Sequence, residues 1–513
     1  MPKDISRPAS DMHKKCHARK ATSICKRGGK AMADNGGQHS TLFLDLSERK
    51  LSVIVHSLFS AWMLAFLFEG QIFYSLAGSF NLDPAIMVFC GIAAVLIGLL
   101  VCGFFIKTKK AARCLFLYSY VIFIAVSAVF FFPPSALWTV GIMVGSFLAG
   151  SCVAAWGFYL KESTPKNQRI KTAADMLILS NILMILLNMT AIHLSPRVGL
   201  AFSMLLLLGA FLFALRLPAG HDDGSHASSR QKNNAISITG LLAFLCLFIV
   251  IITINSGLMY QVINPAFAHL EWLTGWYWAI PYIVALFVMR NLPRKTNRAY
   301  ILYVAIAMIG LSFIAFISLD RTAVGYLVVN TLMLGACGVY DLFWWSILGE
   351  MLDFHGNPAK ILGIGLSANV LGVLMGGIIG NAITSGNEYS LHPSLLALTV
   401  VCVTLILLPP LHKRLSSLLK DHAYLTAFSE IPEQEKTSQV DRALKAGHLS
   451  KRESQVASLL LQGKTYRTIA GELFISENTV KYYVKNIYSK FNIQSRAELI
   501  DIVLKKENSA PSL

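Results

Sequence analysis

Residues 449–503 read LSKRESQVASLLLQGKTYRTIAGELFISENTVKYYVKNIYSKFNIQSRAELIDIV. Ser450 and Glu453 form a capping box, in which the hydroxyl and the carboxylate each bind a free backbone N–H at the start of a helix. The pattern predicts a first helix over residues 451–462. Gly463 is a natural stop for this helix, because glycine readily takes the left-handed conformation that ends many helices.

Three more helices are predicted over residues 466–473, 477–491 and 496–504. Ser476 is the predicted N-cap of the helix over residues 477–491, which is the third helix of the module. This third helix has two chemically different faces. Its apolar stripe consists of Val480, Val484, Ile487 and Phe491. The opposite face carries Asn478, Lys481, Tyr482, Lys485 and Ser489. A short helix, a tight turn and a helix with one basic face make up the helix-turn-helix arrangement that fits the major groove of DNA.

The chain as a whole has the composition of a membrane protein. Of its 513 residues 55% are hydrophobic and 14% are charged, whereas soluble domains average about 25% charged residues. About twelve apolar segments come near the ~20 residues that span a bilayer. Their approximate cores are 52–76, 85–106, 114–132, 135–160, 173–194, 198–217, 236–259, 272–289, 299–319, 323–348, 361–384 and 393–411. The predicted fold is therefore all-α, with a polytopic membrane domain over residues 51–411 and a four-helix module over residues 449–513.

The basic residues indicate how the membrane domain is oriented. Connections after even-numbered segments carry Lys107, Lys109, Lys110, Arg113, Lys161, Lys166, Arg169, Lys171, Arg216, Arg230, Lys232, Arg290, Arg294, Lys295, Arg298 and Lys360. Connections after odd-numbered segments carry Arg197 and Arg321. The positive-inside rule then places both termini in the cytoplasm, on the side where DNA is. We expect a multi-pass protein of the inner (cytoplasmic) membrane.

The ends of the chain and its linker are polar. Residues 1–50 are predicted to be a basic, disordered cytoplasmic tail, and residues 412–448 a charged, partly helical cytoplasmic linker. Four possible metal ligands in the tail match no familiar zinc spacing: His13, Cys16, His17 and Cys25. We expect no metal site and no cofactor. The sequence also lacks a paired nucleophile and base and a phosphate-binding loop, so no enzyme is predicted.

The membrane domain resembles the major facilitator superfamily. The resemblance rests on a six-plus-six arrangement of segments, divided by the polar stretch 218–235, with both ends in the cytoplasm. The loop between the second and third helices of that family usually carries a Gly, an Asp and several basic residues. Here residues 103–110 read GFFIKTKK, with basic residues but no Asp. This departure counts against active transport, because the loop normally helps to hold the two halves in one state.

Charged side chains inside a bilayer are costly and therefore mark candidate sites. Glu69, close to Gln71 in the first segment, is either a ligand or proton site or a carboxylate near the membrane interface. Asp341, close to Trp344 in the tenth segment, has either a gating or binding role or a helix-cap or interface role. These four residues are the candidate ligand or gating residues of the membrane domain.

Other polar and aromatic residues in the segments have simpler explanations. Amide side chains there are predicted to hydrogen-bond between helices: Asn181, Asn188, Asn255, Asn330 and Asn369. Three tryptophans are predicted to form an interfacial aromatic belt or, second, a stacking pocket: Trp272, Trp276 and Trp278.

The helical module resembles the C-terminal domain of LuxR/FixJ-type regulators over residues 449–503. The resemblance implies that Lys481, Tyr482 and Lys485 enter the major groove. It places Thr479 and Lys464 where contacts to the DNA backbone are usual. Thr465 and Asn478, beside them in the sequence, are the remaining candidate DNA contacts. The resemblance also implies a homodimer through residues 496–504 that reads two half-sites. The sequence departs from the family at Thr468, usually Glu, and at Tyr483, usually His.

These features together predict a membrane-embedded one-component transcriptional regulator. The membrane domain would bind an unidentified small molecule, and the module would bind promoter DNA. The alternative is a secondary transporter that carries an accessory DNA-binding regulatory tail. A third possibility treats the membrane domain as a passive anchor.

Overall fold

The structure is a computed structural model that describes residues 47–68, 70–219, 238–292, 298–354, 356–384, 392–429, 448–461 and 464–493, together with Arg496, Glu498, Leu499 and Ile502. Several predictions lie wholly or mostly outside these residues. They concern the tail with its His and Cys residues, Glu69, Gly463, the end of the linker and the helix at 496–504.

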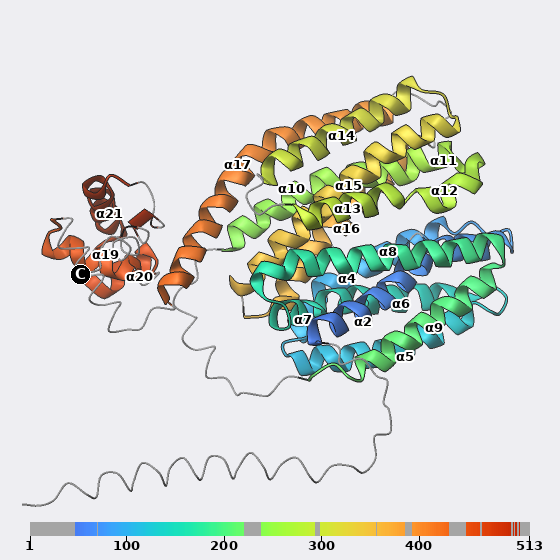
Figure 1. The fold of residues 1–513 in the computed structure, drawn as a ribbon, viewed down its shortest axis with the longest axis horizontal. Helices are drawn as coiled ribbons and strands as arrows, with labels where there is room; N and C mark the ends of the chain where they lie inside the picture. The colour runs from blue at the N-terminus through green and yellow to red at the C-terminus, as the bar shows by residue number, and fades with distance from the viewer. Residues whose placement is uncertain are drawn as a thin grey trace, which may run out of the picture. The chain divides into compact units, whose positions relative to one another are not determined.

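Twelve of the described helical segments are long and apolar enough to cross a membrane, as predicted. The first half of the bundle contains α2 (Glu48–Trp62) with η1 (Met63–Leu67) and α3 (Gln71–Gly78), α4 (Ala85–Phe105), α5 (Lys109–Val129), α6 (Ala136–Ala155) with α7 (Gly157–Glu162), η2 (Lys166–Gln168), α8 (Arg169–His193) and α9 (Pro196–Ala214). The second half contains α10 (Ile238–Leu258) with η3 (Met259–Ile263) and α11 (Asn264–Ala266), η4 (Ala268–Leu270), α12 (Glu271–Tyr277), α13 (Ile280–Asn291), α14 (Arg298–Ser318), α15 (Ala323–Met351), η5 (Leu352–Phe354), α16 (Pro358–Thr384) and α17 (His392–Ser429). Figure 1 shows the helices of each half running side by side.

Small residues allow helices in the bundle to approach closely. A Cβ added to Gly98 in α4 would lie 2.0 Å from the carbonyl oxygen of Phe147 in α6, and one added to Gly257 in α10 would lie 2.2 Å from that of Val373 in α16. Such contacts between backbones replace the hydrophobic driving force that is absent in lipid. Among the described residues, each half therefore contains at least one very close helix pair.

The first and seventh spans are both interrupted by a π-helical turn. These turns are η1 in the first half and η3 in the second. After η1 the chain leaves the helix at Phe68, and a Cβ on Gly70 would lie 2.1 Å from the carbonyl carbon of Ala65, so only glycine fits there. Because π-helical turns occur often at functional sites, the two positions indicate where to look for one.

The C-terminal module has its own apolar core. It is built from α19 (Lys451–Leu461), α20 (Tyr466–Leu473) and α21 (Glu477–Phe491), with bounds within one residue of those predicted. The core consists of Val456, Ala457, Leu460, Leu461, Ile469, Ala470, Val480, Val484, Ile487 and Leu499. The predicted stripe of α21 is confirmed, with Phe491 packed against this core at its edge.

The last membrane helix is longer than its apolar segment. The apolar span ends at Leu411, but α17 continues without a break to Ser429. Pro409 and Pro410 lie inside it. The first part of the predicted linker is therefore helical.

Candidate DNA-binding face and central cavity

The turn between α20 and α21 is fixed by the backbone. Phe474 takes the left-handed conformation (φ 54°), and the N–H of Ile475 donates to the carbonyl oxygen of Ala470 at 3.0 Å. Ser476 then caps α21, because its hydroxyl accepts the N–H of Thr479 at 3.0 Å. These contacts make a tight connection that holds the start of α21 in place.

One face of α21 is exposed along its length. Asn478, Lys481, Tyr482 and Lys485 are all exposed, whereas Thr479 is half-buried with its hydroxyl 2.8 Å from that of Ser476. Lys481 has one weak ion pair with Glu477, at 3.4 Å, on the same helix. The predicted face thus presents donors and positive charge to solvent, as a groove-binding helix must.

The predicted contacts before α20 have local structural partners. Thr465 caps α20 by accepting the N–H of Thr468 at 3.2 Å, and the two hydroxyls lie 2.8 Å apart. Lys464 forms an ion pair with Glu472 at 2.5 Å, and its carbonyl oxygen accepts from Arg496 at 2.9 Å. Thr468, where the related regulators usually carry Glu, therefore takes part in the cap.

A buried carboxylate joins the start of α19 to the end of α21. The Oε2 atom of Glu453 accepts the N–H of Ser450 at 2.7 Å, and the N–H of Glu453 donates to the Ser450 hydroxyl at 3.3 Å, which confirms the predicted capping box. The same Oε2 lies 2.7 Å from Nζ of Lys490. The hydrogen bond from Lys490, with those from Ser450, holds the pKa of Glu453 below its ordinary value.

A cavity of about 250 Å³ lies within the bundle and is lined by both halves. Its wall includes both π-helical turns, through Met63 and Leu64 of η1 and Met259 and Tyr260 of η3. Segments that bend at matching places in the two halves are typical of binding sites at the middle of a transporter-like bundle.

Of the predicted membrane residues, Asp341 lines the cavity. Its Oδ2 atom accepts a hydrogen bond from the Tyr282 hydroxyl of α13 at 3.0 Å. Trp344 is buried instead among α10 and α14 residues, away from the cavity, because α15 turns it by about 100° from its neighbour Trp345, which does line the wall. Gln71 bonds to Ser75 of its own helix at 3.2 Å and is not part of the wall.

The amides and tryptophans divide between the predicted roles. Asn330 donates to the carbonyl oxygen of Trp278 at 3.2 Å, as predicted for an interhelical bond. Asn181 instead donates to Leu177 in its own helix and lines the cavity, as does Asn369. Trp278 also lines the cavity, whereas Trp272 is 62% exposed, as a belt residue would be. A hydropathy pattern cannot separate these cases, since all of them sit in equally apolar segments.

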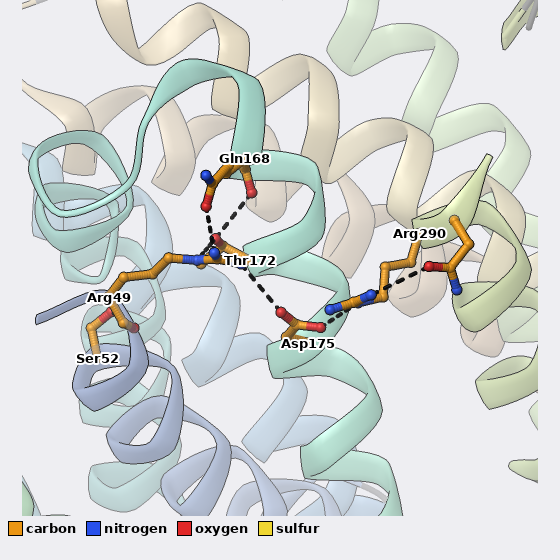
Figure 2. A network of polar contacts seen from close by, with 7 residues as sticks. Arg49, Ser52, Gln168, Thr172, Asp175 and Arg290 are labelled. Carbon is orange, nitrogen blue, oxygen red and sulfur yellow. Dashed lines mark hydrogen bonds and ion pairs between the residues drawn. The ribbon is translucent and has the colours of Figure 1, made fainter. Parts of the chain in front are cut away.

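Polar contacts close the bundle at the end where α2 begins and α13 finishes, here called the basic end. Figure 2 shows Asp175 of α8 between Arg49 of α2 and Arg290 of α13. Its Oδ1 lies 2.5 Å from Nε of Arg290 and its Oδ2 lies 3.3 Å from Nη2 of Arg49. Because α13 belongs to the second half and the other two helices to the first, Asp175 ties the halves together.

A second set of contacts at the basic end is more deeply buried. Arg169 of α8 contacts both oxygens of Asp353 in η5, at 2.9 and 3.0 Å, and donates to the carbonyl oxygen of Gly349 at 2.8 Å. Burial works to raise the pKa of Asp353, but the hydrogen bonds and charge of Arg169, with the charges of Lys166 and Lys161, hold it below its ordinary value. This bidentate pair is the stronger of the two links between the halves.

The loop that lacks the expected Asp has another link to the second half. The Asn357 amide donates to the carbonyl oxygens of Gly103 and Ile106 at 2.7 and 3.0 Å, at the end of α4. A Cβ on Gly103 would lie 2.4 Å from Cα of Lys360, so the two backbones touch there. An amide from the second half therefore satisfies the carbonyl groups that end α4.

Comparison with known proteins divides the chain in the same way. Residues 447–503 match the family model of bacterial regulatory proteins of the luxR family. The spore germination protein GerE of Bacillus subtilis is 42% identical over 57 residues, 11% of this chain and 77% of GerE. An HTH-type regulator of Aeromonas salmonicida is 46% identical over 63 residues, which cover 12% of this chain and 32% of that protein.

Among solved structures, the membrane domain is similar to two transporters. The human organic anion transporter MFSD10 aligns with a TM-score of 0.53 and 14% identity over 71% of this chain and 98% of its own. The proton:xylose symporter XylE aligns with a TM-score of 0.54 and 13% identity over 72% of this chain and 95% of its own. At this identity the likeness shows a shared fold alone.

Proposed function

Because this chain belongs, through residues 447–503, to the luxR family of bacterial regulatory proteins, we propose that it is a membrane-embedded one-component transcriptional regulator. The C-terminal module binds promoter DNA, and the membrane domain senses a small molecule in its central cavity. The observation that carries this proposal is the presence in one chain of a complete luxR-type module and a multi-pass bundle with a cavity shared by its two halves.

The exposed face of α21 supports the assignment of the DNA contacts. Lys481, Tyr482 and Lys485 are exposed and lie within about one turn of α21, so all three can enter one major groove together. Lys464, Thr465, Asn478 and Thr479 flank this face at the starts of α20 and α21, where phosphates are favourably bound. The module acts as a homodimer through residues 496–504.

The basic end supports the proposed orientation. Arg49, Arg169 and Arg290 lie there with Lys109 and Lys360, as the positive-inside rule expects of a cytoplasmic surface. Both termini then lie in the cytoplasm, and the module meets DNA close to the inner membrane.

The contacts between the halves support a sensing mechanism. A ligand that contacts both walls of the cavity changes the energy of any arrangement in which the halves separate or close. The Arg169–Asp353 and Arg290–Asp175 pairs form only when the halves are together at the basic end. Ligand binding thus shifts the position of α17, which belongs to the second half and precedes the DNA-binding module in the chain.

Genome-wide occupancy of the full-length protein tests the DNA-binding part. Sharp promoter peaks are expected for the wild type and are expected to vanish in a Lys481→Ala/Lys485→Ala protein. The matched control Lys451→Ala/Arg452→Ala removes two exposed charges from α19 and should keep the peaks. A wild-type protein without peaks in any growth condition would overturn the proposal.

The transporter fold favours one alternative, a secondary transporter with an accessory DNA-binding tail. This alternative requires flux of a solute across the membrane, carried with a proton or ion bound at Asp341. Uptake into proteoliposomes that is abolished by Asp341→Asn would favour transport. Absence of uptake, with occupancy that responds to the same solute, would favour sensing.

A further inference from the structure

We propose that the ligand of the central cavity is a compact organic cation, an amine or quaternary ammonium compound with an apolar or aromatic body. This inference rests on the proposed sensing function and names the ligand class for that cavity. It comes from the charge, the hydrogen bonding and the aromatic rings of the wall.

The wall carries one acidic side chain and, among its described residues, no basic one. Among its described residues, Asp341 is the single carboxylate, and no lysine, arginine or histidine is present. An anionic ligand would therefore meet repulsion and no compensating donor charge. A cation can form a charge-assisted hydrogen bond with the Asp341 carboxylate, which a neutral ligand cannot. A cation is therefore the ligand class that this wall favours.

Asp341 retains acceptor capacity towards the cavity. A carboxylate can accept about four hydrogen bonds, and among the described residues Asp341 accepts one, from the Tyr282 hydroxyl. The neighbouring Tyr340 hydroxyl is engaged elsewhere, at 2.5 Å from Ser256 and 3.2 Å from Sγ of Cys337. The carboxylate is thus positioned by one neutral donor, which leaves it available to a charged ligand.

Aromatic rings provide the second feature that a cation requires. The wall includes Phe68, Tyr260, Trp278, Tyr282 and Trp345. The face of an aromatic ring attracts ammonium groups, and the attraction increases when water is excluded. The ring of Trp345 packs edge-to-face against the ring of Trp156, with ring centroids 5.8 Å apart, and this contact restrains its orientation. Rings beside one carboxylate suit a cation whose remaining surface is apolar.

The size of the cavity limits the ligand. Its volume of about 250 Å³ lies just below the range of about 300–1,000 Å³ that is usual for small-molecule sites. A ligand with one ring and one small ammonium group fits this volume, whereas a large polycyclic cation does not. Benzyltrimethylammonium has these properties and serves as the probe.

The test uses the full-length protein in lipid nanodiscs without DNA, with tryptophan fluorescence as the readout because Trp278 and Trp345 lie in the wall. Saturable quenching is expected with benzyltrimethylammonium and none with the anion phenylacetate. Asp341→Asn is expected to weaken cation binding at least tenfold. Asp320→Asn, which removes an exposed carboxylate between α14 and α15, is the matched control and should leave it unchanged.

A second variant keeps the proposal testable if Asp341→Asn does not fold. Asn369→Asp adds a carboxylate to the same wall and is expected to tighten binding of the probe at least threefold. Phenylacetate binding as tight as that of the cation would overturn the proposal, as would wild-type affinity in Asp341→Asn. So would an Asn369→Asp protein that binds the cation no better than the wild type.

Binding is measured without DNA, so the two proposals can fail separately. Saturable binding that depends on Asp341 supports the ligand class even if promoter occupancy does not respond to the probe; in that case the sensing function is wrong. Absence of binding overturns the ligand class even if occupancy responds to another compound.

Discussion

Replacing Lys490 with methionine is expected to destabilise the C-terminal module by about 1–2 kcal/mol. The substitution keeps the length of the side chain but removes the ammonium group from the Glu453 carboxylate, 2.7 Å away. Hydrogen bonds to charged groups contribute about 1.5–3 kcal/mol, and exposed ion pairs about 0–1 kcal/mol. The Glu453 side chain is 6% exposed and that of Lys490 is 39% exposed, so the pair lies between these limits.

The same pair makes the stability of the module depend on pH. The hydrogen bond from Lys490 lowers the pKa of Glu453 in the folded state. Its contribution is therefore complete above the ordinary glutamate pKa of about 4.3 and is lost as the pH falls through the lower folded value. The difference in stability between the wild type and Lys490→Met should be full at neutral pH and should shrink in acid.

Urea unfolding of residues 440–513, followed by circular dichroism, measures these effects. A double-mutant cycle with Glu453→Gln isolates the pair from its separate contacts. Lys485→Met removes a lysine from the exposed face of the same helix, and its free energy of unfolding should stay within about 0.5 kcal/mol of the wild-type value. The reasoning is refuted by a coupling energy below about 0.3 kcal/mol, or by equal acid sensitivity of the wild type and Lys490→Met.

Three further substitutions test other contacts. Gly103→Val should lower the free energy of unfolding of the membrane domain by about 1–3 kcal/mol, because its Cβ would meet the Lys360 backbone at 2.4 Å; an unchanged melting temperature in detergent would contradict this. Phe474→Gly should stabilise the module by about 0.5–1 kcal/mol, since Phe474 is left-handed and 94% exposed; urea unfolding measures it, and a loss of stability would count against it. Asp353→Asn should cost about 3 kcal/mol by leaving the buried Arg169 without its counter-charge; thermal unfolding of the purified protein is the check, with Asp320→Asn as the control.

Much of the fold follows from local sequence signals. Ser450 and Glu453 predicted a helix start because both halves of a capping box lie within four residues of each other. The apolar stripe of α21 was likewise predictable, since helical periodicity alone decides which side chains face inward. The twelve spans follow from length and hydropathy in the same way.

The cavity wall could be predicted only in part, because it is assembled from both halves. Asp341 stood out as a charge in an apolar segment. Tyr282 and Trp345, which adjoin it in space, did not, since aromatic residues are common throughout the bundle. The sequence did not distinguish Trp344 from the adjacent Trp345. The two side chains point in different directions around α15, and Trp345 is the one that lines the cavity. The links of Asp175 and Arg169 across the halves depend on tertiary packing and had no local signal.

Helix α17 extends well beyond the membrane span, so a bend near the membrane surface moves its far end. The 18 residues from His412 to Ser429 extend about 27 Å beyond the apolar span at the helical rise of about 1.5 Å per residue. Pro409 and Pro410 lack backbone N–H groups, so the helix is weakest where it leaves the membrane. A bend of about 10° at this fulcrum moves the far end by about 5 Å, more than the ~3.4 Å rise between successive base pairs. We therefore expect that a small bend at Pro409 and Pro410 would displace the far end of α17 by more than the spacing between base pairs.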